Sequence, residues 1–267
     1  MIAQTPDLLG TIVAATRRIV EVRQAERPLS TLAREQTRTP RGPAFEKALR
    51  RDTAPGTARV IAECKRRSPS KGILRADYHP ASHARAYAEA GAVAISVLTE
   101  PTFFDGSLDH LRDVRGAVDL PLLRKDFVVT EYQLLEAAVL GADAVLLIVG
   151  ALDQRALASL IRAAHGLSLA ALVEIHDLDE LHRAVDAGAR IIGVNSRNLR
   201  TLAVDPAVFE LVATHLPSST TTVAESGIRT REDLTRLSQI GYDAFLVGER
   251  LIAQPDPGAA LRELVRT

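Results

Sequence analysis

The sequence is poor in several residue types. Its 267 residues include no tryptophan, one methionine and one cysteine, and aromatic residues make up 4%. A single cysteine, Cys64, excludes internal disulfides and cysteine-rich zinc modules, and it fits a reducing compartment, so we expect a cytoplasmic protein. An excess of one charge is also lacking, because 33 Lys and Arg residues balance 33 Asp and Glu residues. This balance argues against a protein built mainly to bind nucleic acid or an acidic membrane surface.

Long apolar runs are absent as well. The longest, residues 144–152, is far shorter than the roughly 20 residues that a membrane helix needs, so we expect no membrane association. The start, MIAQTPDLLG, has no basic stretch followed by an apolar one, and we therefore expect no signal peptide. With 46% hydrophobic and 25% charged residues, the composition is that of an ordinary globular protein.

Lysine is scarce although basic residues are not. Only four of the 33 basic residues are lysine, namely Lys47, Lys65, Lys71 and Lys125, and the other 29 are arginine. This preference for arginine raises the question of why lysine remains at these four positions.

Glycines recur at nearly constant spacing. Intervals of 25, 25, 25 and 22 residues separate Gly91, Gly116, Gly141, Gly166 and Gly188. Each glycine follows a helix-like segment, as a left-handed helix-ending residue would, and precedes a short apolar run. Eight such runs, rich in Val, Ile and Leu, indicate strands buried on both faces: 59–62, 93–98, 120–123, 144–149, 170–175, 191–194, 221–224 and 244–247.

Strand and helix therefore alternate about eight times, which predicts an α/β protein with a single-domain (β/α)8 TIM barrel. An open doubly wound sheet is the structural alternative, but no glycine-rich nucleotide fingerprint follows a strand. We expect an N-terminal helical extension over residues 1–55 and the barrel over residues 56–267. An apolar stripe near the start of the extension suggests a helix that either plugs the bottom of the barrel or covers the active mouth.

Polar residues stand where the predicted strands end. The two-residue period of a strand places Glu63 and Lys65 on one face of their strand. It also places Lys125 and Glu174, each in its own strand, on the same face as the apolar residue two positions earlier. Asn195 and Glu225 repeat the arrangement. In a barrel these side chains point inward at the C-terminal ends of the strands, where catalytic groups gather.

A structural ion-pair network is the simplest interpretation of these charges. In a chain with 29 arginines, however, a plain ion pair would be expected to use arginine, whose charge is effectively fixed. Lysine that is partly desolvated can lose its proton and serve as a general acid, and nearby glutamates can serve as bases. The lysines thus favour catalysis.

Two glycine turns follow the last strands, at Ser226-Gly227 and Gly248-Glu249. Loops after strands seven and eight are the common phosphate site of such barrels, which favours a phosphorylated ligand over mere chain reversal. His79 and His83 lie four residues apart but lack a further ligand, so we expect no metal site.

Eight motifs occur in order and resemble the indole-3-glycerol phosphate synthase family. They are IAECKRRSPSKG (61–72), ISVLTE (95–100), FFDGS (103–107), LLRKDF (122–127), GADAVLLIV (141–149), LVEIH (172–176), IGVNSRNL (192–199) and AESGI (224–228). The resemblance implies conversion of 1-(2-carboxyphenylamino)-1-deoxyribulose 5-phosphate to indole-3-glycerol phosphate, with loss of carbon dioxide and water, in tryptophan biosynthesis. It implies no metal or organic cofactor.

The resemblance also implies roles for single residues. Lys125 would be the general acid for ring closure, with Glu174 and Glu63 as carboxylates in the acid–base work. Lys65 would hold anionic groups of the substrate, and Asn195 would belong to the polar wall. Which carboxylate and which lysine serve the dehydration stays open. The implied substrate- and phosphate-binding residues are Ser68, Phe104, Arg197, Glu225, Ser226, Gly227 and Gly248.

Glu249 departs from a pattern in which some members have serine, and we expect its side chain to point away from the phosphate. The rival enzyme class is a sugar-phosphate isomerase of the same fold, such as phosphoribosylanthranilate isomerase, which would leave several of the charged residues without a task. A non-catalytic binding barrel would be expected to lack Lys125, Glu174 or Lys65. The expected partner is a small phosphorylated substrate, and the oligomeric state stays open, with a monomer favoured.

Overall fold

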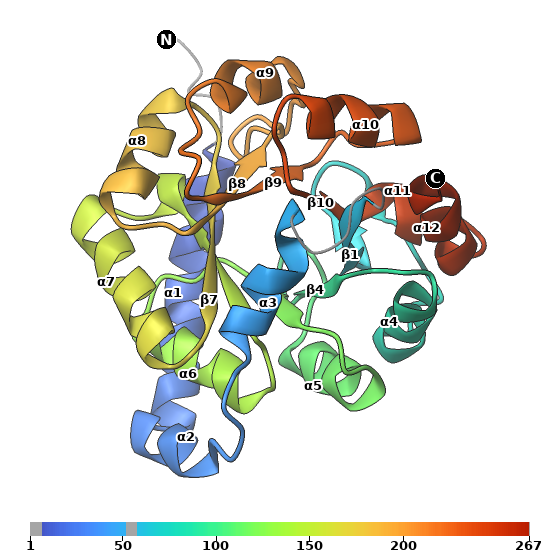
Figure 1. The fold of residues 1–267 in the computed structure, drawn as a ribbon. Coiled ribbons are helices and arrows are strands. Elements are labelled where there is room, and N and C mark those ends of the chain that lie inside the picture. Colours follow the sequence, from blue (N-terminus) through green and yellow to red (C-terminus); the bar gives the residue numbers. More distant parts are fainter. Residues whose placement is uncertain (1–6, 52–57, 267) are drawn as a thin grey trace, which may run out of the picture.

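Eight parallel strands close into a barrel in the computed structural model, which describes residues 7–51 and 58–266 (Figure 1). Each strand pairs with its neighbours in chain order, and the first pairs with the last. The predicted (β/α)8 barrel is confirmed, and the doubly wound alternative is wrong. The barrel strands are β1 (Arg59–Cys64), β4 (Ala94–Leu98), β5 (Leu122–Lys125), β6 (Ala144–Ile148), β7 (Ala170–Ile175), β8 (Ile191–Asn195), β9 (Thr221–Glu225) and β10 (Ala244–Val247).

Helices surround the barrel and alternate with its strands (Figure 1). A small hairpin, β2 (Arg67–Ser68) with β3 (Gly72–Ile73), interrupts the loop after β1. The helices that follow strands are α4 (Pro80–Glu89), α5 (Leu108–Ala117), α6 (Glu131–Val139), a short 3-10 helix η2 (Val149–Ala151), α7 (Gln154–Gly166), α8 (Leu178–Asp186), α9 (Ala207–Ala213), α10 (Arg231–Gln239), α11 (Glu249–Ile252) and α12 (Pro257–Val265).

The prediction that the repeated glycines end helices in the left-handed conformation is only partly confirmed. Gly91, Gly141 and Gly188 adopt the left-handed conformation, with φ of 97°, 93° and 86°. Gly116 lies inside α5 and Gly166 is the last residue of α7, so the prediction is wrong for these two. After α7 the chain turns through Ser168 instead, with φ of 60°.

Alternation along β7 shows how the barrel sorts side chains. Ala171, Val173 and Ile175 belong to the apolar layer between strands and helices, whereas Leu172 belongs to the layer inside the barrel. Glu174 follows Leu172 by two residues and therefore points inward as well, as the two-residue period predicts. The same rule places Cys64 in the outer layer.

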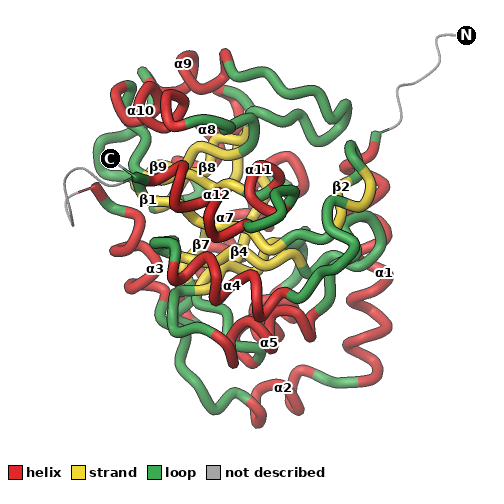
Figure 2. Tube along the Cα trace, turned by 90° about the vertical axis from the view of Figure 1, so that its right-hand side faces the viewer, coloured by secondary structure: helices red, strands yellow, loops and turns green. Residues whose placement is uncertain are grey.

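Three helices precede β1: α1 (Leu8–Glu26), α2 (Leu29–Glu35) and α3 (Gly42–Leu49). Helix α3 closes the N-terminal end of the barrel, where Phe45 and Leu49 are fully buried in the inner layer. Helix α1 lies at the opposite end, together with β2 (Figure 2). There Asp7 pairs with Arg200, in the loop after β8, at 3.3 Å. The plug interpretation thus applies to α3 and not to α1, while the predicted boundary at 55/56 lies outside the described residues.

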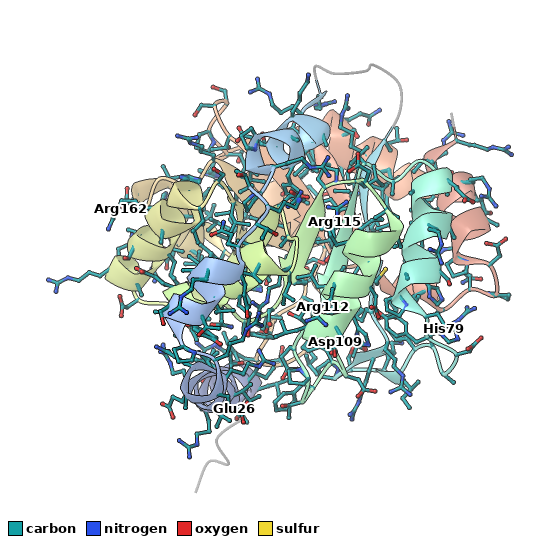
Figure 3. The ribbon with its side chains drawn as sticks, turned by 90° about the horizontal axis from the view of Figure 1, so that it is seen from below. Glu26, His79, Asp109, Arg112, Arg115 and Arg162 are labelled. Atoms are coloured by element: carbon teal, nitrogen blue, oxygen red, sulfur yellow. The ribbon has the colours of Figure 1, made fainter. Side chains whose placement is uncertain are left out.

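Asp143 ties this extension to the barrel. It lies just before β6, is fully buried, and accepts a hydrogen bond of 2.5 Å from Arg38 of the α2–α3 connection. Arg115, labelled on α5 in Figure 3, donates to its other oxygen at 3.2 Å. The backbone N–H groups of Arg41 and Leu122 complete the shell at 2.8 and 3.0 Å. One carboxylate therefore joins the extension, α5 and β5.

We expect Asp143→Ala to lower the free energy of unfolding by about 3 kcal/mol, because the arginines around it lose their buried partner. Asp119→Ala is the matched control: Asp119 pairs with the same Arg41 and Arg115, but its side chain is 96% exposed. Its loss should cost less than about 1 kcal/mol. Urea unfolding followed by circular dichroism measures both, and equal effects would contradict the assigned role of Asp143.

Candidate active site

A cavity of about 470 Å³ opens at the C-terminal end of the barrel strands. All twelve side chains or glycines that the sequence predicts for the site line it: Glu63, Lys65, Ser68, Phe104, Lys125, Glu174, Asn195, Arg197, Glu225, Ser226, Gly227 and Gly248. They come from the ends of five barrel strands and from the loops that follow the barrel strands. The closed barrel brings them together although they span 186 positions of the sequence.

Lys125 is the centre of the charged part of the cavity. Its Nζ lies 3.1 Å from Glu174 Oε2 and 3.6 Å from Glu225 Oε2. Both carboxylates are almost completely buried, so little water is present to screen them from the ammonium. The lysine and the two glutamates therefore form one strongly coupled cluster across β5, β7 and β9.

This cluster sets the pKa values of its members. Burial by itself would lower the pKa of Lys125, but Glu174, Glu225 and Glu63 outweigh burial and raise it. The expectation that desolvation makes this lysine lose its proton is therefore wrong. For Glu174, burial would raise the pKa, yet Lys125 and His176 hold it below its usual value. Burial raises the pKa of Glu225 well above its usual value, and the charge of Glu174 adds to this.

Three carboxyl groups thus meet two ammonium groups, and their charges balance when one of the carboxyl groups is protonated. The raised pKa of Glu225 favours its protonated form, while Glu174 is held ionised beside Lys125. Lys65 makes its own pair, with Nζ 2.6 Å from Glu63 Oε2. The cavity therefore holds an ammonium that is available as an acid and a carboxylate that is available as a base.

Two glycines make room for these carboxylates. A Cβ at Gly248 would lie 3.1 Å from Glu63 Cβ and would collide with the Glu63 carboxylate. A Cβ at Gly193 of β8 would collide with the Glu225 carboxylate in the same way. Gly248 thus leaves room for the Glu63 carboxylate, and it also belongs to the loop where phosphate binding is predicted.

The loop after β9 has an unusual backbone. Ser226 and Gly227 are consecutive residues in the left-handed region, with φ of 67° and 71°. Ser196 lies beneath this turn, where its hydroxyl donates to the Glu225 carbonyl at 3.3 Å. The turn, Gly248 and the start of α11 all line the cavity, at the ends of the neighbouring strands β9 and β10. This is the arrangement that two adjacent glycine turns predict for a phosphate cradle.

Another wall of the cavity is apolar, and a guanidinium lies at the cavity mouth beside Glu249. Phe104 packs on Phe127 with ring centroids 6.1 Å apart, beside Leu146 and Ile148. Arg197 reaches across the mouth, and its Nη1 donates to Ser70 Oγ at 3.3 Å. A planar aromatic group with an acidic substituent would match this wall.

Glu249 does not point away from the site. Its carboxylate faces the mouth of the cavity, 3.7 Å from Arg197 Nη2 and 4.0 Å from Lys71 Nζ. The expectation failed because two cations from loops distant in sequence attract this side chain, and neither position could be related to Glu249 before the fold was known. Lys71 and Ser70 also line the cavity, although the sequence assigned them no role in binding.

Residues 7–51 and 58–266 hold neither a metal-ion cluster nor a membrane-spanning helix. No group of three or more His, Cys, Asp or Glu side chains in these ranges is placed to hold a metal ion. None of the helices in this part of the chain combines the length and apolar character needed to cross a bilayer.

A closed (β/α)8 barrel with lysines and glutamates converging on a cavity at its C-terminal mouth defines the chain as a barrel enzyme. The sequence profile of the family described as indole-3-glycerol phosphate synthase matches residues 9–264. The chain belongs to this family, whose members act in tryptophan biosynthesis.

Curated relatives agree over nearly the full length. The indole-3-glycerol phosphate synthase of Streptomyces griseus is 50% identical over 258 residues, which cover 97% of this chain and 94% of the relative. Indole-3-glycerol phosphate synthase 1 of Streptomyces coelicolor is 49% identical over the same length and coverage. Among solved structures, thiamine phosphate pyrophosphorylase from Pyrococcus furiosus has a TM-score of 0.59 at 17% identity, covering 77% of this chain and 93% of that one. That likeness concerns the fold alone.

We expect Gly248→Ala to lower kcat for the family's reaction by about 100-fold, because the new methyl group would displace the Glu63 carboxylate. Gly116→Ala is the control, since a Cβ there meets nothing within 4 Å and α5 should be stabilised by about 0.5–1 kcal/mol. Indole fluorescence measures the rate, and thermal melting measures stability. A Gly248→Ala protein that melts normally and turns over at the parent rate would contradict the role of this contact.

Proposed function

We propose that this chain closes the indole ring of 1-(2-carboxyphenylamino)-1-deoxyribulose 5-phosphate and releases indole-3-glycerol phosphate, carbon dioxide and water. The observation that carries the proposal is Lys125, an ammonium directed into the cavity between two buried carboxylates. A sugar ketone is a poor electrophile until its oxygen receives a proton. Lys125 can supply that proton from a site where water does not compete.

In the first step, the aromatic carbon that bears the carboxylate attacks the ketone carbon. A carbon–carbon bond forms, the C=O π bond breaks, and Lys125 gives its proton to the oxygen. The raised pKa of Lys125 keeps the donor protonated over the working range of pH. Phe104 and Phe127 would hold the anthranilate ring in the orientation that the attack needs, a contact worth about 0.5–1.5 kcal/mol beyond burial.

In the second step, the carbon–carboxylate bond breaks and carbon dioxide leaves. The electron pair of that bond restores the aromatic ring, so decarboxylation is strongly driven once the ring has closed. The remaining step removes the new hydroxyl as water, with one proton given to the oxygen and one taken from the ring. Glu174 is the candidate base because its pKa is held low, and Lys125 and Lys65 are both candidates for the acid.

Binding of the substrate would use both ends of the cavity. We assign the phosphate to the turn at Ser226 and Gly227 and to the backbone at Gly248. Lys65 and Arg197 would meet the anionic groups, with Ser68 beside them. Asn195 supports the polar wall, since its Oδ1 accepts a hydrogen bond of 2.9 Å from the Arg197 backbone N–H.

We propose further that the enzyme works in the cytoplasm and has no nucleic-acid partner. The charge balance and the single cysteine support this assignment. The rival isomerase activity needs one acid–base pair, and it would leave the second lysine of this cavity without a task.

The proposal is tested by Lys125→Arg, which keeps the positive charge but cannot easily donate the proton. We expect kcat to fall at least ~100-fold, the lower range for a general acid. Lys47→Arg is the matched control, because Lys47 is an exposed residue of α3 at the closed end of the barrel. Its rate should equal that of the parent.

The assay adds the carboxyphenylamino-deoxyribulose phosphate to purified protein in the presence of a metal chelator and follows indole fluorescence. Turnover by the parent and by Lys47→Arg, together with its loss in Lys125→Arg, supports the proposal. A parent protein without turnover would overturn the activity, whereas a normal rate in Lys125→Arg would make Lys125 structural.

A further inference from the structure

Four ionisable side chains, in which basic groups alternate with acidic groups, run from the middle of the cavity to the start of α8. They are the Lys125 ammonium, the Glu174 carboxylate, the His176 imidazole and the Glu180 carboxylate. Successive distances are 3.1 Å from Lys125 Nζ to Glu174 Oε2, 3.6 Å from Glu174 Oε1 to His176 Nε2, and 3.0 Å from His176 Nδ1 to Glu180 Oε2. The motifs that identify the family place His176 next to the site, but the proposed mechanism leaves it without a task.

The two oxygens of Glu174 are divided between two cationic partners. Oε2 accepts the hydrogen bond from Lys125, and Oε1 faces His176. Neither Glu174 Oε1 nor His176 Nε2 is in contact with solvent, and each lacks a hydrogen-bond partner within the described structure. These two buried, unpartnered atoms lie 3.6 Å apart, just beyond hydrogen-bond distance, so each is placed to complement the other.

Glu180 determines which nitrogen of the His176 imidazole must carry a proton. Its Oε2 lies at hydrogen-bond distance from His176 Nδ1 and also accepts the His176 backbone N–H at 2.8 Å. A proton therefore belongs on Nδ1. If the ring were neutral, the lone pair of Nε2 would then face the lone pairs of Glu174 Oε1. Only the imidazolium presents an N–H to both carboxylates.

The place of Glu180 is itself fixed by the fold. It lies in the first turn of α8, where Asp177 caps the helix by accepting the Glu180 backbone N–H at 2.8 Å. A Cβ at Gly150 of η2 would lie only 2.8 Å from Oε1 of Glu180. The glycine therefore leaves room for this second carboxylate oxygen. The anchor of His176 is thus built from two successive loops of the barrel.

We propose that His176 is a positioning residue which, as an imidazolium held by Glu180, fixes the orientation and the ionised state of Glu174 beside Lys125. The inference rests on the proposed function in so far as Glu174 acts as its base. His176 does not touch the reacting atoms in this account, because it acts through Glu174.

The electrostatics of the chain agree with this geometry. Burial would lower the pKa of His176, but the bond to Glu180 and the charge of Glu174 outweigh burial and Lys125 and raise it. In turn His176 helps Lys125 to hold the pKa of Glu174 low. As pH rises through the raised pKa of His176, Glu174 loses one of its two cations. As pH falls through the lowered pKa of Glu174, the base itself is lost.

The test compares His176→Gln with His182→Gln. His182 is an exposed histidine of α8, so the same substitution there should leave rate and pH profile unchanged. His176→Gln should lower kcat at least ~10-fold with little change in KM, because Glu174 is misplaced and substrate contacts remain. The acid limb of its kcat–pH profile should move to higher pH, since Glu174 has lost a cation. A lower rate with an unshifted profile would show a merely structural role and overturn the proposal.

A second measurement needs no turnover and separates this inference from the proposed function. In ligand-free protein labelled with ¹³C-histidine, the His176 ring signal should titrate above the ordinary histidine pKa of about 6.5. In Glu180→Gln it should titrate at lower pH, because the anchoring charge is gone. A His176 signal that titrates below the ordinary value in the parent would overturn the inference even if the enzyme is fully active. Absence of turnover with the expected titration would count against the proposed function alone.

Discussion

The ion pair between Lys125 and Glu174 is the interaction on which the site depends. Without that ammonium, Glu174, Glu225 and Glu63 would place three carboxylates in one water-poor cavity, where their mutual repulsion is strong. With it, Glu174 is held ionised, while burial and the charge of Glu174 raise the pKa of Glu225 and favour its protonated form. The acid and the base of the proposed mechanism are therefore products of one arrangement.

Two adjacent residues of β5 carry charges with different roles. One belongs to a structural ion pair outside the barrel, and the other belongs to the active site inside it. Arg124 points outward and is fully buried, with its guanidinium 2.9 Å from Asp126 and 2.8 Å from Glu136. Lys125 points inward to the cavity. Where a permanent ion pair holds strand and helix together, the chain uses arginine; where a proton must move, it uses lysine. Three of the four lysines, Lys65, Lys71 and Lys125, line the cavity.

Much of the fold and the site could be predicted because both follow from short-range patterns. The two-residue period of β7 was sufficient to turn Glu174 inward, and the barrel then required all strand ends to meet. Other features depend on contacts across the sequence. Glu249 faces Arg197 and Lys71 from separate loops, and the raised pKa of Lys125 needs three strands in place. Gly116 failed as a helix end because α5 continues past it to Ala117.

The protonation of Lys125 can be measured directly, because a chain with four lysines gives a sparse spectrum. Protein labelled with ¹⁵N-lysine would be titrated toward high pH, with the Lys125 signal assigned by its loss in Lys125→Arg. We expect Lys125 to remain an ammonium beyond the ordinary lysine pKa of about 10.4. A Lys125 signal that loses its proton well below that value would contradict the charge arrangement from which the mechanism is derived.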